Sequence, residues 1–137
     1  MANAAEVAGR YYDALGRNDA TAVGQTLSED CTAHVPGATL EGRAQVLGWM
    51  QPFFDAFPDL EHVPGELTER GDTVETDLRL RGTHSAPLVS PEGEIPATGR
   101  RVDFIAHNVL RVAHDEIVEL TITFDPADFA RQLGLAP

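Results

Sequence analysis

Tyr11, His62 and Asn108 carry the side chains that best suit chemistry on a carbonyl compound. A phenol in an apolar cavity can donate a hydrogen bond to a carbonyl oxygen as negative charge builds on it. A histidine changes protonation near neutral pH and can act as a base. We therefore expect Tyr11 and Asn108 to polarise an oxygen and His62 to move a proton.

A purely structural role is the alternative for both Tyr11 and His62. Tyr11 could be a core residue whose hydroxyl bonds to a backbone carbonyl, and His62 could lie at a sheet margin or in a dimer contact. His34 is a second candidate base. His84 lies in a predicted loop, where it would contact a ligand at the cavity mouth or cap a backbone group. His114 falls in a predicted hairpin turn and should be hydrated.

The register of the last two predicted strands decides which polar residue faces inward. Leu120, Ile122 and Phe124 alternate with polar residues and form one apolar face. The neighbouring strand should then turn Asn108 inward and His107 outward, although a slip of one residue would reverse both.

Helical spacing and turn residues predict the elements that must position these side chains. The expected helices are Ala4–Arg17, a short one capped by Asp19 and running through Leu27, Arg43–Phe57, and Asp128–Leu133. The expected strands are Cys31–Val35, Leu60–Glu69, Thr73–Arg81, Val102–Val112 and Glu116–Phe124.

Three positions in this scheme need comment. Pro52 should kink the third helix or end its first half, because proline removes a helix hydrogen bond. A long loop is expected from Gly82 to Gly99. Asp125 should cap the terminal helix rather than face the cavity.

Helices followed by a strongly curved antiparallel or mixed sheet predict an α+β fold. The length, 137 residues, suits a single domain spanning 1–137. If the sheet curls around the helices, an apolar cavity remains between them. Trp49 and Phe53 lie at helical spacing and could line it.

Composition excludes several partners and sites. The net charge is -12, which argues against nucleic acid or an anionic membrane as a partner. No apolar run is long enough to span a bilayer, and the first residues lack the pattern of a secretion signal, so we expect a cytoplasmic protein. Cys31 is the only cysteine and is interpreted as a buried thiol.

Short motifs in a consistent order resemble the SnoaL-like polyketide cyclases, a branch of the NTF2-like superfamily. They are Tyr11–Leu15, Gly48-Trp49, Ala56–Leu60, Gly82–His84, Pro96–Val102 and Arg131–Gly134. The resemblance implies a cone-shaped α+β barrel, usually a homodimer through the sheet. It also implies a pocket for a small apolar molecule and no metal or organic cofactor.

The family's catalytic residues do not all carry over. The cyclases pair an aspartate on the last strand with a histidine on the strand before it, and these positions are Ile122 and Asn108 here. The related delta-5-3-ketosteroid isomerases place their base where this chain has Val35, while their oxyanion-holding tyrosine matches Tyr11. The Asp-Arg-Asp set of the limonene-epoxide-hydrolase-like members has no counterpart.

These observations leave two classes of function open. The first is a cyclase-type protein that binds a small apolar carbonyl compound and catalyses cofactor-free aldol cyclisation or isomerisation. In that case Trp49, Phe53, His84 and Ile122 would contact the substrate. The second is a non-catalytic binding protein or a divergent enzyme, such as a hydroxylase or hydrolase.

Overall fold

The computed structural model describes residues 3–90 and 93–135. Its helices are α1 (Ala4–Gly16), α2 (Ala20–Thr26), α3 (Arg43–Ala56) and α4 (Pro126–Gln132). Its strands are β1 (Leu27–Val35), β2 (Ala38–Glu41), β3 (Glu61–Pro64), β4 (Thr68–Arg70), β5 (Thr73–Thr83), β6 (Leu88–Ser90), β7 (Gly93–Ile95), β8 (Arg101–Ala113) and β9 (Glu116–Thr123).

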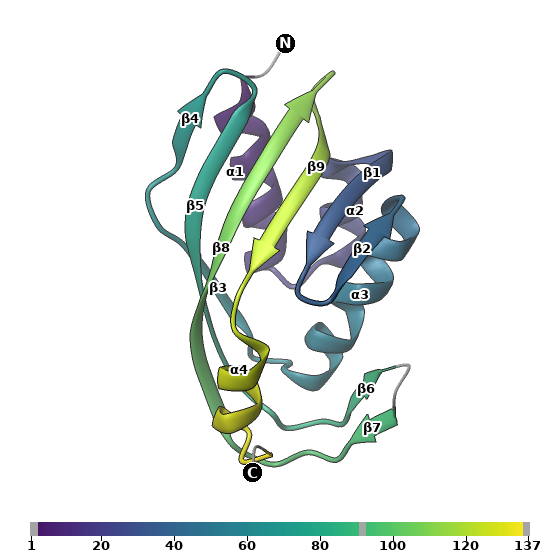
Figure 1. Cartoon of the computed structure of the whole chain (residues 1–137), viewed down its shortest axis with the longest axis vertical. Coiled ribbons are helices and arrows are strands. Elements are labelled where there is room, and N and C mark those ends of the chain that lie inside the picture. Colours follow the sequence, from purple (N-terminus) through teal and green to yellow (C-terminus); the bar gives the residue numbers. More distant parts are fainter. Residues whose placement is uncertain (1–2, 91–92, 136–137) are drawn as a thin grey trace.

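One curved sheet forms the framework of the molecule. Its strand order is β2-β1-β9-β8-β5-β3, and β4 also pairs with β5. Helices α1, α2 and α3 lie against one face of this sheet, whereas α4 lies beyond the end of β9 (Figure 1). The expected α+β fold is confirmed.

Helix α1 places Tyr11 against the sheet. Asn3 caps the helix by accepting a hydrogen bond from the Glu6 N–H at 2.8 Å. The apolar side of the helix then buries residues one turn apart, including Val7, Tyr11 and Leu15. Because these residues pack into the main core, the ring of Tyr11 points toward the interior.

The long hairpin of β8 and β9 fixes the predicted register. Asn108 lies directly across from Ile122, and Leu110 lies across from Leu120. Asn108 is buried, whereas His107 is exposed on the opposite face of the sheet. The inward orientation of Asn108 is therefore confirmed.

Strand β1 runs parallel to β9, so the sheet is mixed, which is one of the two expected arrangements. One expected strand is divided in the structure. The strand expected over Leu60–Glu69 is divided into β3 and β4, because Gly65 and its neighbours leave the ladder while the Gly65 N–H still bonds to the Asp77 carbonyl.

The expected long loop also contains structure. Residues between Gly82 and Gly99 include the small hairpin β6–β7. This hairpin was missed because its strands are only three residues long.

Pro52 does not end the first half of α3, since the helix is continuous from Arg43 to Ala56. The carbonyl that loses its helix partner belongs to Gly48, which is exposed. Hydration of that carbonyl can offset part of the lost hydrogen bond. Asp125 caps α4 as predicted, accepting from the Ala127 N–H at 2.9 Å.

Candidate functional site

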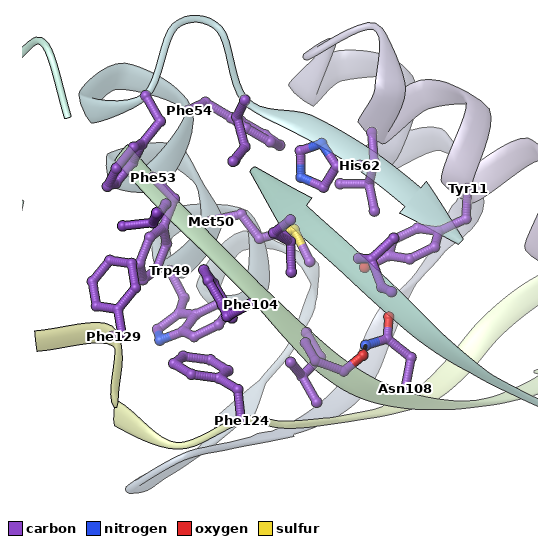
Figure 2. A pocket seen from close by; sticks show the side chains of 18 residues that line it. Tyr11, Trp49, Met50, Phe53, Phe54, His62, Phe104, Asn108, Phe124 and Phe129 are labelled. Atoms are coloured by element: carbon purple, nitrogen blue, oxygen red, sulfur yellow. Dashed lines mark hydrogen bonds between the residues drawn. The ribbon is translucent and has the colours of Figure 1, made fainter. Parts of the chain in front are cut away.

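A cavity of about 70 Å³ lies between the helices and the inner face of the sheet. Its walls come from α1, α3, β3, β5, β8, β9 and α4. The lining residues are Tyr11, Leu15, Trp49, Met50, Phe53, Phe54, Phe57, Leu60, His62, Leu78, Leu80, Val102, Phe104, Ala106, Asn108, Ile122, Phe124 and Phe129. Figure 2 shows Tyr11, His62 and Asn108 on one side and several aromatic rings on the other.

We call Tyr11, His62 and Asn108 the polar end of the cavity. Tyr11 and Asn108 are each only 1% exposed. They come from α1 and β8, and His62 comes from β3, so three distant segments meet here. The three catalytic candidates of the sequence are thus brought to one cavity.

The Tyr11 hydroxyl has no hydrogen-bond partner among the residues that the structure describes. Its ring lies edge-on to Tyr12, with centroids 5.0 Å apart. Burial, and secondarily the nearby Cys31, raises the pKa of Tyr11 well above its usual range. The phenol therefore stays protonated and keeps an unused hydrogen-bond donor at the cavity.

Asn108 is held in a defined orientation by two hydrogen bonds. The Tyr12 hydroxyl donates to its Oδ1 at 2.9 Å, and its Nδ2 donates to the Ala106 carbonyl at 3.2 Å. A carbonyl acceptor at Ala106 requires the amide nitrogen on that side, so the two bonds agree on the orientation. One N–H of the amide remains available.

Tyr12 lies one position round the helix from Tyr11, and its hydroxyl is the partner that fixes Asn108. Sequence spacing could not reveal this, because the bond joins residues 96 positions apart.

Burial favours the neutral form of the His62 imidazole near pH 7. Burial lowers its pKa to about 4, and the Leu15 backbone opposes this to a smaller extent. Its Nδ1 is buried and has no hydrogen-bond partner among the described residues. A base with this pKa has about the proton affinity of an ordinary aspartate.

The opposite side of the cavity, the aromatic end, consists of Trp49, Phe53, Phe104, Phe124 and Phe129. Neighbouring rings have centroids 5.1–6.3 Å apart in tilted or edge-to-face arrangements. All five side chains are partly exposed. This end therefore forms the mouth of the cavity.

Trp49, Phe53 and Ile122 line the cavity as the sequence predicted, but Phe104 and Phe129 were missed. Phe104 shares the inward face of β8 with Asn108, so strand alternation could have identified it. Phe129 gave no such signal, since α4 buries no residue fully and its position depends on tertiary packing.

His84 lies outside the cavity lining. Its ring is fully buried and stacks on Phe57 at 5.3 Å. Its Nδ1 accepts from the Thr98 N–H at 3.2 Å. Since burial also lowers its pKa, His84 serves as a neutral bridge to the 97–101 segment.

The remaining histidines also lie away from the cavity. His34 bonds to Glu119 at 2.9 Å, and His107 bonds to both Asp77 and Glu75. These carboxylates raise the pKa of His107, with Asp77 contributing most. His114 is exposed in its turn.

Other candidate chemistry finds no support in the described part of the chain. Cys31 is buried, and burial raises the pKa of its thiol. Within residues 3–90 and 93–135, no three His, Cys, Asp or Glu side chains are arranged to hold a metal ion. No helix in these ranges has the length and apolarity to span a membrane.

Comparison with known proteins is consistent with this architecture. Residues 8–120 match the SnoaL-like domain family. No curated protein sequence matches the chain.

Several solved structures share the fold. A proposed SnoaL-like polyketide cyclase from Jannaschia sp. CCS1 has a TM-score of 0.83 at 22% identity, covering 97% of this chain and 92% of its own. AclR, a proposed hydroxylase from Streptomyces galilaeus, has a TM-score of 0.82 at 21% sequence identity, and the match covers 96% of each chain. IdmH, a proposed polyketide cyclase from Streptomyces antibioticus, has a TM-score of 0.79 at 26% sequence identity, and the match covers 97% of this chain and 99% of IdmH.

Proposed function

The chain belongs to the SnoaL-like domain family, and we propose that its cavity binds a small, uncharged carbonyl compound with the oxygen at the polar end. One observation carries this proposal. Tyr11, His62 and Asn108 gather at one end of a cavity whose other walls are apolar apart from the indole N–H of Trp49. Such a site suits a ligand with one hydrogen-bonding group and an apolar body.

The charge of the ligand follows from the lining. Arg, Lys, Asp and Glu are absent from the residues that line the cavity, and His62 is neutral at pH 7. A charged ligand would lose its hydration without gaining an ionic partner. A neutral ketone, aldehyde or ester fits better.

The size of the ligand is limited as well. Engineered apolar cavities of about 150 Å³ take up benzene, and this cavity measures about 70 Å³. A molecule of few heavy atoms fits without rearrangement. A single ring such as cyclopentanone must displace side chains of the aromatic end slightly, and a two-ring system must displace them further.

The polar end could also enolise such a compound. Tyr11 and the free N–H of Asn108 would donate to the carbonyl oxygen, while His62 takes a proton from the adjacent carbon. The C–H bond breaks, an N–H bond forms on the imidazole, and the electron pair moves to the oxygen. The enolate could then close a ring by aldol addition or be reprotonated at another carbon.

A second candidate is binding without catalysis, or a different reaction such as hydroxylation. The observation favouring it is that Asn108 and Ile122 face each other across β8 and β9. These are the positions at which the sequence resemblance implies a proton-transferring pair. Ile122 is unable to transfer protons, and the amide of Asn108 does not titrate near pH 7.

We further propose a homodimer through the outer face of the sheet. Val63 and Ile105 are exposed there and flank Arg79 across adjacent strands. Sedimentation velocity should give a dimer mass that reverts to the monomer mass in an Ile105→Glu variant. A wild-type monomer would contradict this assembly.

The ligand proposal is tested with cyclopentanone and cyclopentane, which share a ring but differ in the carbonyl. Trp49 is the only tryptophan and lies at the cavity mouth, so its fluorescence should report binding. We expect Tyr11→Phe to weaken cyclopentanone binding about 5- to 10-fold, for one lost hydrogen bond, and to leave cyclopentane unaffected. Equal binding of both probes would contradict the proposed role of the polar end.

Enolisation is measured separately. In D2O, wild-type protein should accelerate deuterium uptake at the carbons beside the cyclopentanone carbonyl, as followed by NMR. His62→Leu should abolish the acceleration while cyclopentanone still binds. Binding with no acceleration in the wild type would contradict enolisation and leave the second candidate, binding without catalysis or a different reaction.

A further inference from the structure

A second space meets the cavity at His62. It is a groove of about 490 Å³ on the outside of α1, bounded on the other side by β3 and the residues that follow it. Its lining residues are Gly9, Tyr12, Asp13, Gly16, Arg17, His62, Pro64 and Leu67. His62 therefore lines both the inner cavity and the outer groove.

Tyr12 provides a second connection between the two spaces. Its side of α1 borders the groove, and its hydroxyl reaches inward to Asn108, which lines the cavity. Two of the three polar-end residues are thus joined to the groove, His62 directly and Asn108 through Tyr12. The aromatic end has no residue in the groove lining.

We infer that this groove is the route by which water and protons reach the polar end of the cavity, with His62 as the shared wall. The inference rests on the proposed function for its catalytic meaning, because only a base that works in the cavity needs to exchange its proton. In that exchange, protonated His62 gives its N–H proton to a groove water. Neutral imidazole and hydronium result, and the reverse step returns the proton.

The geometry explains why a separate route is needed. A ligand whose oxygen meets Tyr11 and Asn108 places its apolar body against the aromatic end and blocks the mouth. Water then has no path to His62 from that side. The groove lies on the other side of the histidine, so ligand and protons enter from opposite ends.

The sequence of α1 keeps the groove open. Gly9 and Gly16 add no side chain to its helical wall, and a Cβ at either position would meet no atom within 4 Å. Asp13 and Arg17 form an exposed ion pair at 3.6 Å on the same helix, so the rim is hydrated. The groove can therefore be narrowed without disturbing the core.

Diethyl pyrocarbonate tests the route on the protein without ligand. The reagent acylates neutral imidazole, and peptide mass spectrometry gives the rate at each histidine. We expect Gly9→Leu and Gly16→Leu to slow modification of His62 at least about fivefold. Gly48→Leu, an equally unobstructed glycine on the exposed side of α3, should leave that rate unchanged.

Two further measurements separate this route from entry through the cavity mouth. Exposed His114 should react at the same rate in every variant, which controls for the reagent. Phe129→Ala widens the mouth and should not alter the His62 rate. An unreactive His62 in the wild type, no slowing in either groove variant, or acceleration by Phe129→Ala would overturn the inference. None of these results depends on whether cyclopentanone binds.

Discussion

The two ends of the cavity are built in different ways. At the polar end, Tyr12 and the Ala106 carbonyl hold Asn108 through directional hydrogen bonds, and all three of these residues are buried. At the aromatic end, partly exposed rings from α3, β8, α4 and the residue just after β9 contact one another in tilted or edge-to-face arrangements. Hydrogen-bond geometry fixes Asn108 at one end, whereas non-directional packing positions the rings at the other.

Because of this difference, we expect the polar end to select the functional group of the ligand and the aromatic end to select its size. Hydrogen-bond donors with fixed positions discriminate for a carbonyl oxygen, because a misplaced donor loses most of its interaction energy. Aromatic packing tolerates displacement at lower cost, since no single contact dominates it. Polar-end variants should therefore change which functional group binds, and aromatic-end variants should change how large a ligand can be.

The largest expected contrast is in the pH dependence of stability. The pKa of His62 is about 4 in the folded protein, against about 6.5 for an unperturbed histidine. Below pH 6.5 the unfolded chain binds a proton that the folded chain does not. Stability should therefore fall by about 3 kcal/mol as pH drops from 6.5 to 4.

The matched variant for this prediction is His62→Leu, which removes the titrating group. In urea unfolding at several pH values, the free energy of unfolding should fall less steeply with decreasing pH in His62→Leu than in the wild type. Carboxylates such as Asp103 also lose their contribution at low pH, but they are common to both proteins. Parallel curves would show that His62 titrates normally and that the polar end is wetter than the structure indicates.

Phe129→Ala should have the next largest effect, and it acts on the aromatic end. Removing this partly buried ring should cost about 2 kcal/mol, less than the range for a fully buried phenylalanine. It should also let the cavity accept a two-ring ketone such as 1-tetralone, as followed by Trp49 fluorescence. Leu135→Ala, an exposed position shortly after α4, is the control and should change neither quantity. Unchanged 1-tetralone affinity in Phe129→Ala would refute the role of this end in limiting size.

Much of the polar end could be predicted from sequence periodicity. The spacing of Val7, Tyr11 and Leu15 identified the buried side of α1, and alternation along β9 identified the partner face of β8. Both signals are local in the sequence, so they can be recognised without knowledge of the tertiary structure. They were sufficient to orient Tyr11 and Asn108 correctly.

The rest depended on contacts that sequence spacing does not encode. The bond from Tyr12 to Asn108 joins the first helix to the eighth strand. His84 was expected near the mouth because it lies in the predicted loop from Gly82 to Gly99, yet its ring stacks on Phe57 and bonds to Thr98 outside the cavity lining. The low pKa of His62 comes from burial, which a sequence pattern does not quantify.

The smallest expected effect gives the sharpest test of the polar end, because it compares two adjacent tyrosines. Tyr12→Phe removes the donor to Asn108 and leaves a buried amide oxygen without its partner, which should cost about 1–2 kcal/mol. Tyr11→Phe removes a hydroxyl that has no partner among the described residues, so its unfolding free energy should change by less than about 0.5 kcal/mol.

Ligand binding should separate the same two variants in a different way. Tyr11→Phe should lose affinity for cyclopentanone although its fold is intact, because the Tyr11 hydroxyl donates its hydrogen bond to the ligand and to no described residue. Tyr12→Phe should lose affinity through a reoriented Asn108, and its loss should accompany the drop in stability. Chemical denaturation and Trp49 fluorescence on both variants check this. Equal destabilisation by the two substitutions would mean that Tyr11 also bonds within the fold, and it would remove the free donor on which the proposed carbonyl site depends.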